Sequence, residues 1–358
     1  MTLAISTKIT TDIVIVGAGI AGCIAAIALA PHYKVVLIDQ HAEPPMRVGE
    51  CLPAAARRIL KQLNLLSAFE QQDHIQSQGM ASYWGSKKKQ ISDNILNPDG
   101  FGWHINRPNF EKQLRQVAQE RGVYCLWPAK LVASKEVSQQ WYLTTDTAKV
   151  IIANFVIDAG GRKAPFVRQR NIKRTVQDKL VSYWLTVKDD NKYQMGVISA
   201  NELGWWYSAP IPNNKRIIAF QTDSDLLDFK ARKDVTYILK QAATNTEIAS
   251  WLTNKLSSSI QYHGITSANS SKLCHVAGDN WAALGDAAVS FDPLSSQGMY
   301  NAMACAMQLV KLLLTNANIE QQYNYQIENI WQHYLAHKSL YYRQEKRWQE
   351  NKFWQRRI

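Results

Sequence analysis

A glycine-rich turn near the amino terminus constrains the fold more than any other feature of this sequence. The turn, Gly17-Ala18-Gly19-Ile20-Ala21-Gly22, follows a β-branched run at residues 12–16 and precedes an alanine-rich stretch at residues 23–29. A second β-branched run, at residues 35–38, ends at Asp39. Strand, glycine turn, helix, strand and acid in this order are typical of a dinucleotide-binding fold. The sequence therefore predicts a doubly wound, Rossmann-like α/β domain.

Each glycine of the turn has a mechanical role in such a fold. Gly17 turns the chain, Gly19 lets the backbone approach a pyrophosphate, and Gly22 lets the helix pack on the strand. The amides at the helix start then face the phosphates, and Asp39 accepts hydrogen bonds from a ribose. A glycine-rich turn in an unrelated α/β fold is the alternative. Strand, helix and acid at the expected spacing favour the nucleotide site.

Composition narrows the possible partners of the chain. With 358 residues, 46% hydrophobic and 20% charged, it is a globular protein long enough for more than one domain. The net charge of +12 favours anionic partners, but the basic residues are dispersed except at residues 87–89 and in the tail, so we expect no nucleic acid. The apolar runs are interrupted by glycine, proline and histidine, so we expect no membrane span. Five scattered cysteines indicate a reduced, cytoplasmic protein, and no metal site is expected.

The middle and the end of the chain have different patterns from the start. Short alternating runs at residues 180–187, 194–199, 205–210 and 216–222 predict an antiparallel sheet, with a hairpin turn at residues 212–215. An apolar helix is predicted at residues 298–314, followed by a helical, aromatic tail. We therefore expect an α/β domain, an antiparallel-sheet substrate domain and C-terminal helices. The expected division is residues 1–80, 106–170 and 270–318 for the nucleotide domain, 81–105 and 171–269 for the substrate domain, and 319–358 for a helical cap.

Four further blocks resemble the flavoprotein monooxygenases of the para-hydroxybenzoate hydroxylase type, and within them the tryptophan-halogenase-like branch. These blocks are Arg47-Val48-Gly49-Glu50-Cys51-Leu52-Pro53, Asn106-Arg107-Pro108-Asn109-Phe110-Glu111, Asp158-Ala159-Gly160-Gly161-Arg162, and Gly285-Asp286-Ala287-Ala288 with Asp292-Pro293 and Ser296-Gln297-Gly298. The resemblance extends from about residue 12 to about residue 314. It implies that the dinucleotide is FAD.

The resemblance also implies where the cofactor lies. Asp286 would bind the ribityl and ribose side of FAD, and the helix that follows Gly298 would direct its amides at the isoalloxazine ring. A helix amino terminus placed there stabilises the negative charge of reduced flavin. Taken singly, Asp286 is an ordinary turn acid and residues 296–298 are an ordinary helix cap. The expected cofactor-binding residues are Gly17, Gly19, Ile20, Ala21, Gly22, Asp39, Gln40, Arg47, Gly49, Glu50, Arg107, Asp158, Ala159, Gly160, Gly285, Asp286, Pro293, Ser296, Gln297, Gly298 and Met299.

Only one dinucleotide fingerprint is present in the sequence. We therefore expect no separate NAD(P)H domain, and electrons come either from NAD(P)H bound transiently at the flavin or from a partner flavin reductase.

The departure from the halogenase pattern concerns residues 204–210. Flavin halogenases carry a W-x-W-x-I-P block, and here Tyr207 and Ala209 replace the second tryptophan and the isoleucine. Halogenases also use a lysine to capture hypohalous acid, whereas residues 87–89 read as a solvated loop. The block at 204–210 and the tail at 341–357 are more similar to flavoproteins of quinoprotein biogenesis, which mature cysteine tryptophylquinone in bacterial amino-acid oxidases. An amphipathic helix that caps the fold is the alternative for the tail.

This resemblance implies a monooxygenase that hydroxylates an indole or other aromatic group through a flavin C4a-hydroperoxide. The substrate would be a tryptophan of a partner protein, the precursor of a quinoprotein oxidase, or an aromatic small molecule. The alternatives are a flavin-dependent halogenase, a small-molecule hydroxylase, and a non-catalytic FAD-binding maturation chaperone. The expected catalytic residues are Glu50, Asp292 and His104 as candidate bases, and Trp205 and Trp206 as the lining of a dry pocket. The thiol of Cys51 is expected to pack, and a redox role beside the flavin is the alternative.

Overall fold

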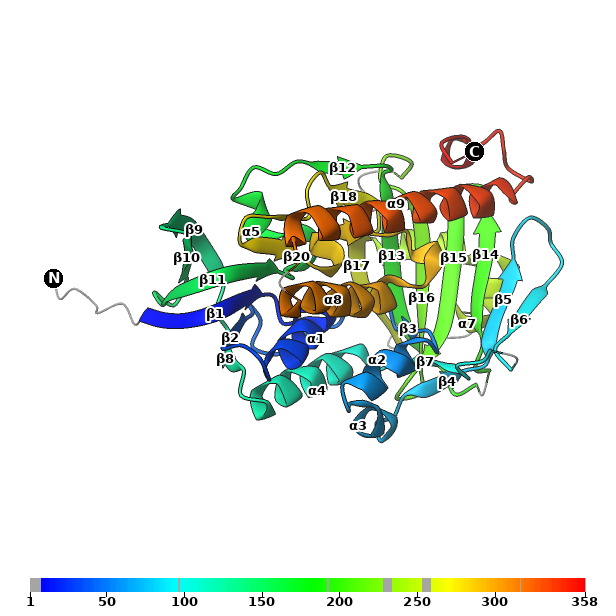
Figure 1. Cartoon of the computed structure of the whole chain (residues 1–358). Coiled ribbons are helices and arrows are strands. Elements are labelled where there is room, and N and C mark those ends of the chain that lie inside the picture. Colours follow the sequence, from blue (N-terminus) through cyan, green and yellow to red (C-terminus); the bar gives the residue numbers. More distant parts are fainter. Residues whose placement is uncertain are drawn as a thin grey trace.

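The structure, a computed structural model, describes residues 8–95, 97–191, 193–227, 234–252, 259–315 and 317–357. The glycine turn follows a strand in the middle of a largely parallel sheet with the order β19-β20-β11-β1-β2-β8 (Figure 1). Strands β10 and β9 extend this sheet antiparallel beside β11. Its strands are β1 (Lys8–Val16), β2 (Val35–Ile38), β8 (Tyr124–Leu126), β9 (Leu131–Val137), β10 (Gln140–Thr145), β11 (Val150–Asp158), β19 (Ala277–Gly278) and β20 (Trp281–Ala283).

The register of this sheet explains why motifs distant in sequence meet at one edge. Val16, the last residue of β1, pairs with Ile38 of β2 and with Asp158 of β11. Asp158 pairs in turn with Ala283 of β20. All four strands are parallel, so their carboxyl ends share one edge. The segments that follow them, each carrying a predicted motif, therefore leave the sheet side by side.

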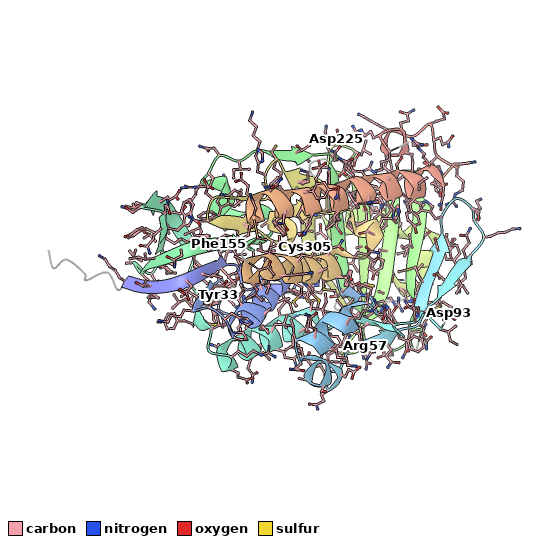
Figure 2. All side chains as sticks on the ribbon, in the orientation of Figure 1. Tyr33, Arg57, Asp93, Phe155, Asp225 and Cys305 are labelled. Atoms are coloured by element: carbon pink, nitrogen blue, oxygen red, sulfur yellow. The ribbon has the colours of Figure 1, made fainter. Side chains whose placement is uncertain are left out.

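Helices pack against this sheet and against one another. Helix α1 (Ile20–Leu29), rich in alanine and almost entirely buried, packs between α4 (Arg107–Glu120) and α8 (Gly298–Leu314) (Figure 1). Helix α8 has the predicted bounds, and Cys305 on it lies in the middle of the molecule (Figure 2). Short elements complete this layer: η1 (Gly161–Lys163), α5 (Pro165–Arg168), α2 (Ala56–Gln62) and α3 (Leu66–Glu70).

A small sheet lies between the nucleotide-binding layer and the second large sheet. It has the order β3-β7-β4, with β3 (Cys51–Leu52), β7 (Gly102–His104) and β4 (Ile75–Ser77). Strand β3 contacts α8, and β7 contacts β15 of the second sheet. The segment around Glu50 is thereby held between the two layers.

The second large sheet has the order β17-β13-β16-β15-β14-β5-β6 and is antiparallel except for the β14–β5 pair. Asn213 and Asn214 both have positive φ, which is typical of the predicted hairpin turn. The strands are β5 (Gly79–Tyr83), β6 (Gln90–Asp93), β13 (Leu180–Lys188), β14 (Gly196–Asn201), β15 (Gly204–Ile211), β16 (Lys215–Asp223) and β17 (Ile260–Ser267). Helices α6 (Val235–Ala243) and α7 (Thr246–Leu252) pack on one face. These observations confirm the predicted antiparallel sheet.

The C-terminal helices join the two halves of the molecule. Helix α9 (Ile319–Arg343) runs along both layers (Figure 1), and a third small sheet, β12 (Arg174–Val176), β18 (Ser271–Leu273) and β21 (Val289–Ser290), lies beside it. Tyr323 and Trp331 of α9 belong to the core of the nucleotide layer. Tyr342 belongs to a separate cluster with residues of β15 and of α10 (Lys352–Gln355). The helical cap is thus a structural bridge between the sheets.

The predicted division of the chain stays a prediction. Helix α9 begins at residue 319, where the cap was expected, and β5 begins two residues before the expected start of the substrate unit at 81. Strand β7, within 81–105, pairs with β3 and β4 rather than with the second sheet. None of the described helices has the length and apolar character that crossing a bilayer requires.

Buried ion pairs fasten the tail to the second sheet. Asp223, at the end of β16, is 1% exposed and accepts hydrogen bonds from Arg357 at 2.5 Å and from Arg356 at 2.7 Å. The Arg357 guanidinium also lies 3.7 Å from the centroid of the Phe353 ring. The neighbouring Asp225 binds Arg356 in a more exposed setting. The basic, aromatic tail is therefore packed as a cap.

We predict that Asp223→Ala lowers the free energy of unfolding by about 3–5 kcal/mol, because it leaves the buried Arg357 without its partner. Asp225→Ala is the matched control and should cost no more than about 1 kcal/mol, since its ion pairs are partly exposed. Urea unfolding of both variants measures the difference. Equal losses in the two variants would contradict a stabilising role for the buried Asp223–Arg357 ion pair.

Candidate functional site

The glycine turn between β1 and α1 forms the first part of the site. Gly17 has φ +111°, and a Cβ on it would lie 2.4 Å from the carbonyl oxygen of Ala159. A Cβ on Gly22 would lie 1.9 Å from the carbonyl oxygen of Gly17. At Gly19 the nearest atom to a Cβ would be Nη1 of Arg47, at 3.9 Å. Two glycines thus allow close backbone packing, and the third leaves room for a ligand beside a cationic side chain.

Asp39 is buried at the end of β2 and tied to this turn. Its Oδ2 accepts the N–H of Ala18 and its Oδ1 accepts the N–H of His41, both at 2.8 Å. Arg115 of α4 lies 3.3 Å from Oδ1 and donates to the carbonyl of Ala18 at 3.1 Å. Each carboxylate oxygen can still accept a further bond, such as one from a ribose hydroxyl. Gln40, next in the chain, is exposed.

Arg115 is a site residue that sequence analysis missed. It is 4% exposed, and it also donates to the carbonyl of His41 at 2.9 Å, so it joins the glycine turn to the loop after β2. The signal that could have found it is spacing. Arg107, Glu111 and Arg115 recur at four-residue intervals and therefore lie on one face of α4.

The carboxylate of Asp158 supports the turn after β11 from inside the protein. It is fully buried, with Oδ1 accepting the N–H of Gly160 and Oδ2 accepting those of Phe166 and Val167, each at 2.9 Å. Burial raises the pKa of Asp158 to about 6, and the three backbone hydrogen bonds oppose that rise. The part of this block that meets the glycine turn is therefore the backbone of Ala159 and Gly160.

The loop after β20 brings the amino ends of α1 and α8 together. It contains η4 (Gly285–Ala287), and its first residue, Gly285, has φ +55°. A Cβ on Gly285 would lie 3.1 Å from the Cβ of Ala21 and 3.5 Å from the Cβ of Ala302. Ala21 lies in the first turn of α1, and Ala302 lies at the start of the second turn of α8. Asp286 follows with a side chain 49% exposed and Oδ2 3.6 Å from Nε of Arg162. This carboxylate is accessible to a ligand.

The tip of α8 is open. It follows η5 (Pro293–Ser295) and Ser296, which has φ +50°. Pro293, Gln297 and Gly298 are exposed and Met299 is buried. A Cβ on Gly298 would meet no described atom within 4 Å. The first N–H groups of a helix have no partner within the helix, so this tip can receive a ring edge that carries negative charge.

Asp292, immediately before η5, lies inside the protein. It is 1% exposed, its Oδ1 accepts the N–H of Leu294 at 2.9 Å, and its Oδ2 accepts the hydroxyl of Tyr342 at 2.9 Å. Burial raises its pKa, and the positive charge of Lys338 opposes the rise. Of the Asp292-Pro293 pair, only Pro293 is exposed.

Glu50 is a second buried carboxylate, 4% exposed, and it links the loop before β3 to the second sheet. Its Oε1 accepts the hydroxyl of Tyr207 at 2.6 Å, and its Oε2 accepts the N–H of Gly49 at 3.1 Å. Burial raises the pKa of Glu50, while the hydrogen bond from Tyr207, then backbone hydrogen bonds, and last the charge of Arg107 oppose the rise. Arg107 also donates to the carbonyl of Val48 at 2.8 Å, which fixes the same loop to α4.

His104 and Cys51 face each other as a register pair of β7 and β3. The His104 ring is fully buried, and neither nitrogen forms a hydrogen bond of normal geometry within the described chain. Burial and then the charge of Arg216 lower its pKa to about 4, so the ring is neutral at pH 7. Burial, with the charge of Glu50, raises the pKa of Cys51 to about 12. A thiol that stays protonated is a poor nucleophile, in line with the expected packing role.

The structure contradicts the expectation that Trp205 and Trp206 line one pocket. Successive side chains of a strand point to opposite faces. Trp205 donates to the hydroxyl of Tyr342 at 3.0 Å, and Tyr207 lies on the same face of β15. Trp206 stacks on Phe220 on the other face, with ring centroids 4.5 Å apart, in the core beneath α6 and α7. Trp206 therefore lies away from the buried carboxylates.

The three lysines at residues 87–89 form the exposed turn between β5 and β6, at the outer edge of the second sheet (Figure 1). Asp93, at the end of β6, marks this periphery in Figure 2. Nζ of Lys89 lies 5.4 Å from the centroid of the Tyr193 ring. The prediction of a solvated loop is confirmed.

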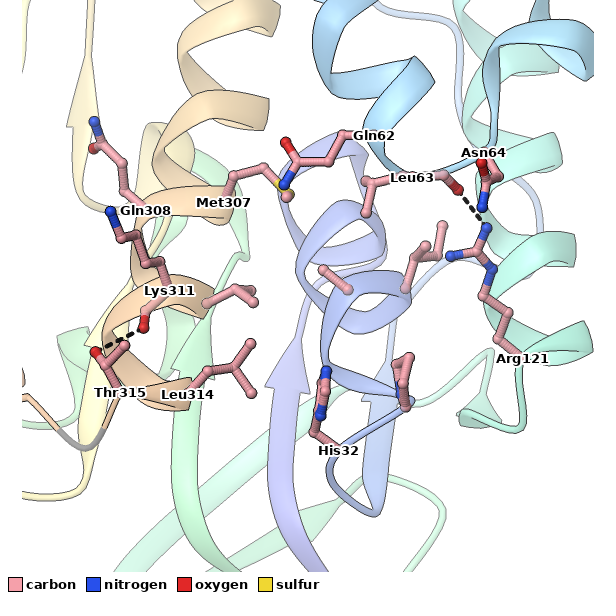
Figure 3. A pocket seen from close by; sticks show the side chains of 14 residues that line it. His32, Gln62, Leu63, Asn64, Arg121, Met307, Gln308, Lys311, Leu314 and Thr315 are labelled. Atoms are coloured by element: carbon pink, nitrogen blue, oxygen red, sulfur yellow. Dashed lines mark hydrogen bonds between the residues drawn. The ribbon is translucent and has the colours of Figure 1, made fainter.

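A groove of about 670 Å³ lies elsewhere in the nucleotide layer (Figure 3). Its lining includes His32, Gln62, Arg121, Lys311 and Leu314. These residues lie towards the carboxyl ends of α1 and α8, a helix length from the amino ends that form the site. This groove is separate from the predicted cofactor site.

The residues present fit a flavin adenine dinucleotide. Gly19 and Gly298 border open space at two helix tips, and Gly285 holds those helices together. Arg47 and the exposed Asp286 supply a cation for phosphate and an acceptor for hydroxyl groups. Within the described residues, no group of three or more His, Cys, Asp or Glu side chains is placed to hold a metal ion.

Comparison with known proteins identifies the family. The model of the tryptophan halogenase family matches residues 69–357, and that of the NAD(P)-binding Rossmann-like domain matches residues 15–50. The chain belongs to the tryptophan halogenase family. The putative FAD-dependent oxidoreductase LodB of Marinomonas mediterranea is 25% identical over 97% of this chain and 96% of its own length. Tryptophan 2-halogenase of Chondromyces crocatus is 23% identical over 83% of this chain, which spans 60% of that enzyme.

Solved structures share the fold of this tryptophan halogenase family member. The myxobacterial chondrochloren halogenase CndH has a TM-score of 0.83 at 18% identity, covering 98% of this chain and 86% of its own. The peptidyl tryptophan dihydroxylase QhpG, essential for tryptophylquinone cofactor biogenesis, has a TM-score of 0.80 at 22% identity, covering 97% and 78%. These findings confirm the predicted family, the α/β fold class with C-terminal helices, the FAD cofactor and the class of FAD-dependent oxidoreductase. The roles of the individual site residues stay predictions.

We predict that Gly19→Glu abolishes FAD binding while the apoprotein still folds. The new side chain enters open space beside Arg47 and brings negative charge to the position of the pyrophosphate. Visible flavin absorbance of the purified variant measures binding, and circular dichroism checks the fold. Gly19→Ala, which adds no charge, should retain more flavin. A Gly19→Glu protein that stays yellow would refute the placement.

A second prediction follows from the corrected position of Trp206. Trp206→Ala should cost about 3–5 kcal/mol of stability through the cavity it leaves, yet turnover per bound flavin should stay close to wild type. Thermal unfolding and turnover normalised to flavin content measure the two effects. A selective loss of turnover would return Trp206 to the active site.

Proposed function

We propose that this protein is an FAD-dependent monooxygenase that hydroxylates an indole ring, and that the ring belongs to a tryptophan of another polypeptide. The observation that carries this proposal is the hydrogen bond of 2.6 Å between Tyr207 and Glu50. Tyr207 stands where flavin halogenases have the second tryptophan of W-x-W-x-I-P. A phenol at this position holds a buried carboxylate at the junction of the cofactor layer and the second sheet.

Hydroxylation of an aromatic ring needs a base at this junction. Bound FAD, reduced by NAD(P)H or by a flavin reductase, supplies the activated oxygen. One oxygen atom of O2 forms a bond to a ring carbon, the other leaves as water, and the ring carbon must then lose its hydrogen as a proton to become aromatic again. The ionised Glu50 accepts that proton. Burial raises its pKa and makes it a stronger base than an exposed glutamate.

The surroundings of Glu50 suit a reaction from which water is excluded. Glu50 and His104 are buried, Cys51 is protonated, and the His104 ring is neutral at pH 7. Tyr207 orients the carboxylate by donating its hydroxyl, and the charge of Arg107 is a smaller influence on Glu50. Activated oxygen is thereby kept from wasteful release as peroxide.

Halogenation is the second candidate function, because the family match, Tryptophan 2-halogenase and the fold of CndH all favour it. Capture of hypohalous acid requires an amine at the site. The lysines at residues 87–89 lie on an exposed outer turn, and Lys89 packs on Tyr193. The position of these lysines on the outer turn favours hydroxylation over halogenation.

Three observations support a protein substrate. QhpG, a peptidyl tryptophan dihydroxylase, shares the fold. A brominase that acts on a pyrrole attached to a peptidyl-carrier protein, from Pseudoalteromonas luteoviolacea, is 23% identical over 82% of the chain. The net charge of +12 suits an acidic partner.

The deciding experiment incubates the FAD-loaded protein with a reductant, O2 and chloride or bromide. Parallel reactions contain a tryptophan-bearing polypeptide encoded beside this gene, free tryptophan, or a simple phenol. Mass spectrometry that finds added oxygen on the polypeptide supports the proposal. Halide incorporation would establish the halogenase, oxidation of only the small molecules would establish a small-molecule hydroxylase, and flavin that never reacts with O2 would leave a non-catalytic chaperone.

We predict that Glu50→Gln lowers turnover by about 10²–10⁴-fold, the usual effect of losing a general base. In the wild type, turnover falls as pH decreases through the raised pKa of Glu50, because the base must be ionised. Tyr207→Phe removes a hydrogen bond that lowers this pKa, so it should move the acid limb of the pH–rate profile to higher pH. Tyr325→Phe, on the exposed face of α9, is the matched control. An unshifted acid limb in Tyr207→Phe would rule out this assignment of the base.

A further inference from the structure

The buried side of α9 carries a polar stripe that packs on the turn before α8. Tyr334, Lys338 and Tyr342 recur at four-residue intervals and so share one helix face. The backbone N–H of Asp292 donates to the hydroxyl of Tyr334 at 2.8 Å. The hydroxyl of Tyr342 donates to Oδ2 of Asp292 at 2.9 Å, and Nζ of Lys338 lies 3.7 Å from the same oxygen. Three residues of the C-terminal helix thus converge on one residue of the cofactor layer.

Asp292 transmits this contact to the tip of α8. Its other oxygen caps η5 through the N–H of Leu294 at 2.9 Å. From η5 the chain passes through Ser296, at φ +50°, and Gln297 to the open start of the helix at Gly298. Only three residues separate Leu294, whose N–H is capped, from Gly298 at the helix tip, so the Asp292 carboxylate helps to set where that tip points.

Hydrogen bonds from other elements orient the side chains of the polar stripe towards Asp292. Trp205 of β15 donates its indole N–H to the Tyr342 oxygen at 3.0 Å, which leaves the hydroxyl hydrogen of Tyr342 for the carboxylate. Oγ of Ser270 lies 2.6 Å from the Tyr334 hydroxyl and accepts from Lys338 at 2.8 Å. Lys338 also pairs with Asp178. Both Asp292 and Tyr342 are almost fully buried, so water does not replace a lost bond there.

We propose that Tyr342 is a positioning residue for FAD: its hydroxyl fixes Asp292, and through Asp292 the amino end of α8 against the isoalloxazine ring. The C-terminal helix then completes a cofactor site whose contacting groups all precede it in the chain. This role concerns the flavin and does not depend on which aromatic substrate is hydroxylated. It also gives the predicted tail motif a function inside the protein rather than on its surface.

The experiment uses the full chain with FAD removed and added back, and measures the dissociation constant by fluorescence titration. Tyr342→Phe removes one hydroxyl and keeps the ring, so the fold should survive. We expect FAD to bind about tenfold more weakly, which corresponds to about 1.4 kcal/mol, and its visible spectrum to shift. Tyr341→Phe is the matched control, since Tyr341 is 57% exposed, and should bind FAD as the wild type does.

A purely structural role for Tyr342 predicts a different result. If the effect passes through Asp292, Tyr342→Phe should weaken FAD binding no further in an Asp292→Asn background. Trp205→Phe keeps the hydroxyl but removes the N–H that orients it, and should give a smaller loss in the same direction. A folded Tyr342→Phe protein with unchanged FAD affinity, or an equal further loss in the Asp292→Asn background, would overturn the proposal. Should Tyr342→Phe fail to fold, unchanged affinity in Trp205→Phe would do so.

Discussion

The close contact of one glycine with two helices is the constraint on which the rest of the structure depends. Gly285 packs against Ala21 of α1 and Ala302 of α8, and its φ of +55° disfavours any residue with a side chain. Helix α1 begins next to this contact and α8 begins about one turn before it, so their unpaired amides converge on one volume. Four parallel strands end at the edge of the sheet next to that volume, since their last residues, Val16, Ile38, Asp158 and Ala283, are paired in register. The cofactor site is thus a product of backbone packing more than of particular side-chain contacts.

Strand β15 connects this site to the rest of the molecule through two buried carboxylates. Tyr207 holds Glu50 directly, and Trp205, two residues earlier on the same face, holds Asp292 by way of Tyr342. Burial raises the pKa of both acids, and in each one carboxylate oxygen accepts a phenol hydroxyl while the other accepts a backbone N–H. One strand therefore orients both the candidate base and the turn that aims α8. The aromatic richness of the chain serves this internal framework, because its indoles and phenols bring polar groups into the core without charge.

Prediction from sequence succeeded where the conformation of a motif depends on residues that are close together in the chain. The glycine turn, the start of α8 at Gly298 and the hairpin at residues 212–215 depend on neighbours in the chain, and local residue types are enough to identify them. It failed where a side chain's direction depends on the register of a sheet, as for Trp205 and Trp206, and where a residue acts on a distant loop, as Arg115 does on Ala18. Asp158 shows a third case, in which a conspicuous acid serves backbone amides inside the protein.

The amino-acid sequence alone determined the dinucleotide-binding α/β fold, because glycines at fixed spacing after a strand leave few other conformations open to the backbone. Its resemblance to tryptophan-halogenase-like flavoproteins implied that the dinucleotide is FAD. Tertiary structure alone decided which acids are buried, which tryptophan faces Tyr342, and that the basic tail packs inward against Asp223. The physical reason is that desolvation and hydrogen bonding act between residues far apart in the chain. These groups come together only once the strands have paired and helix α9 has packed along both large sheets.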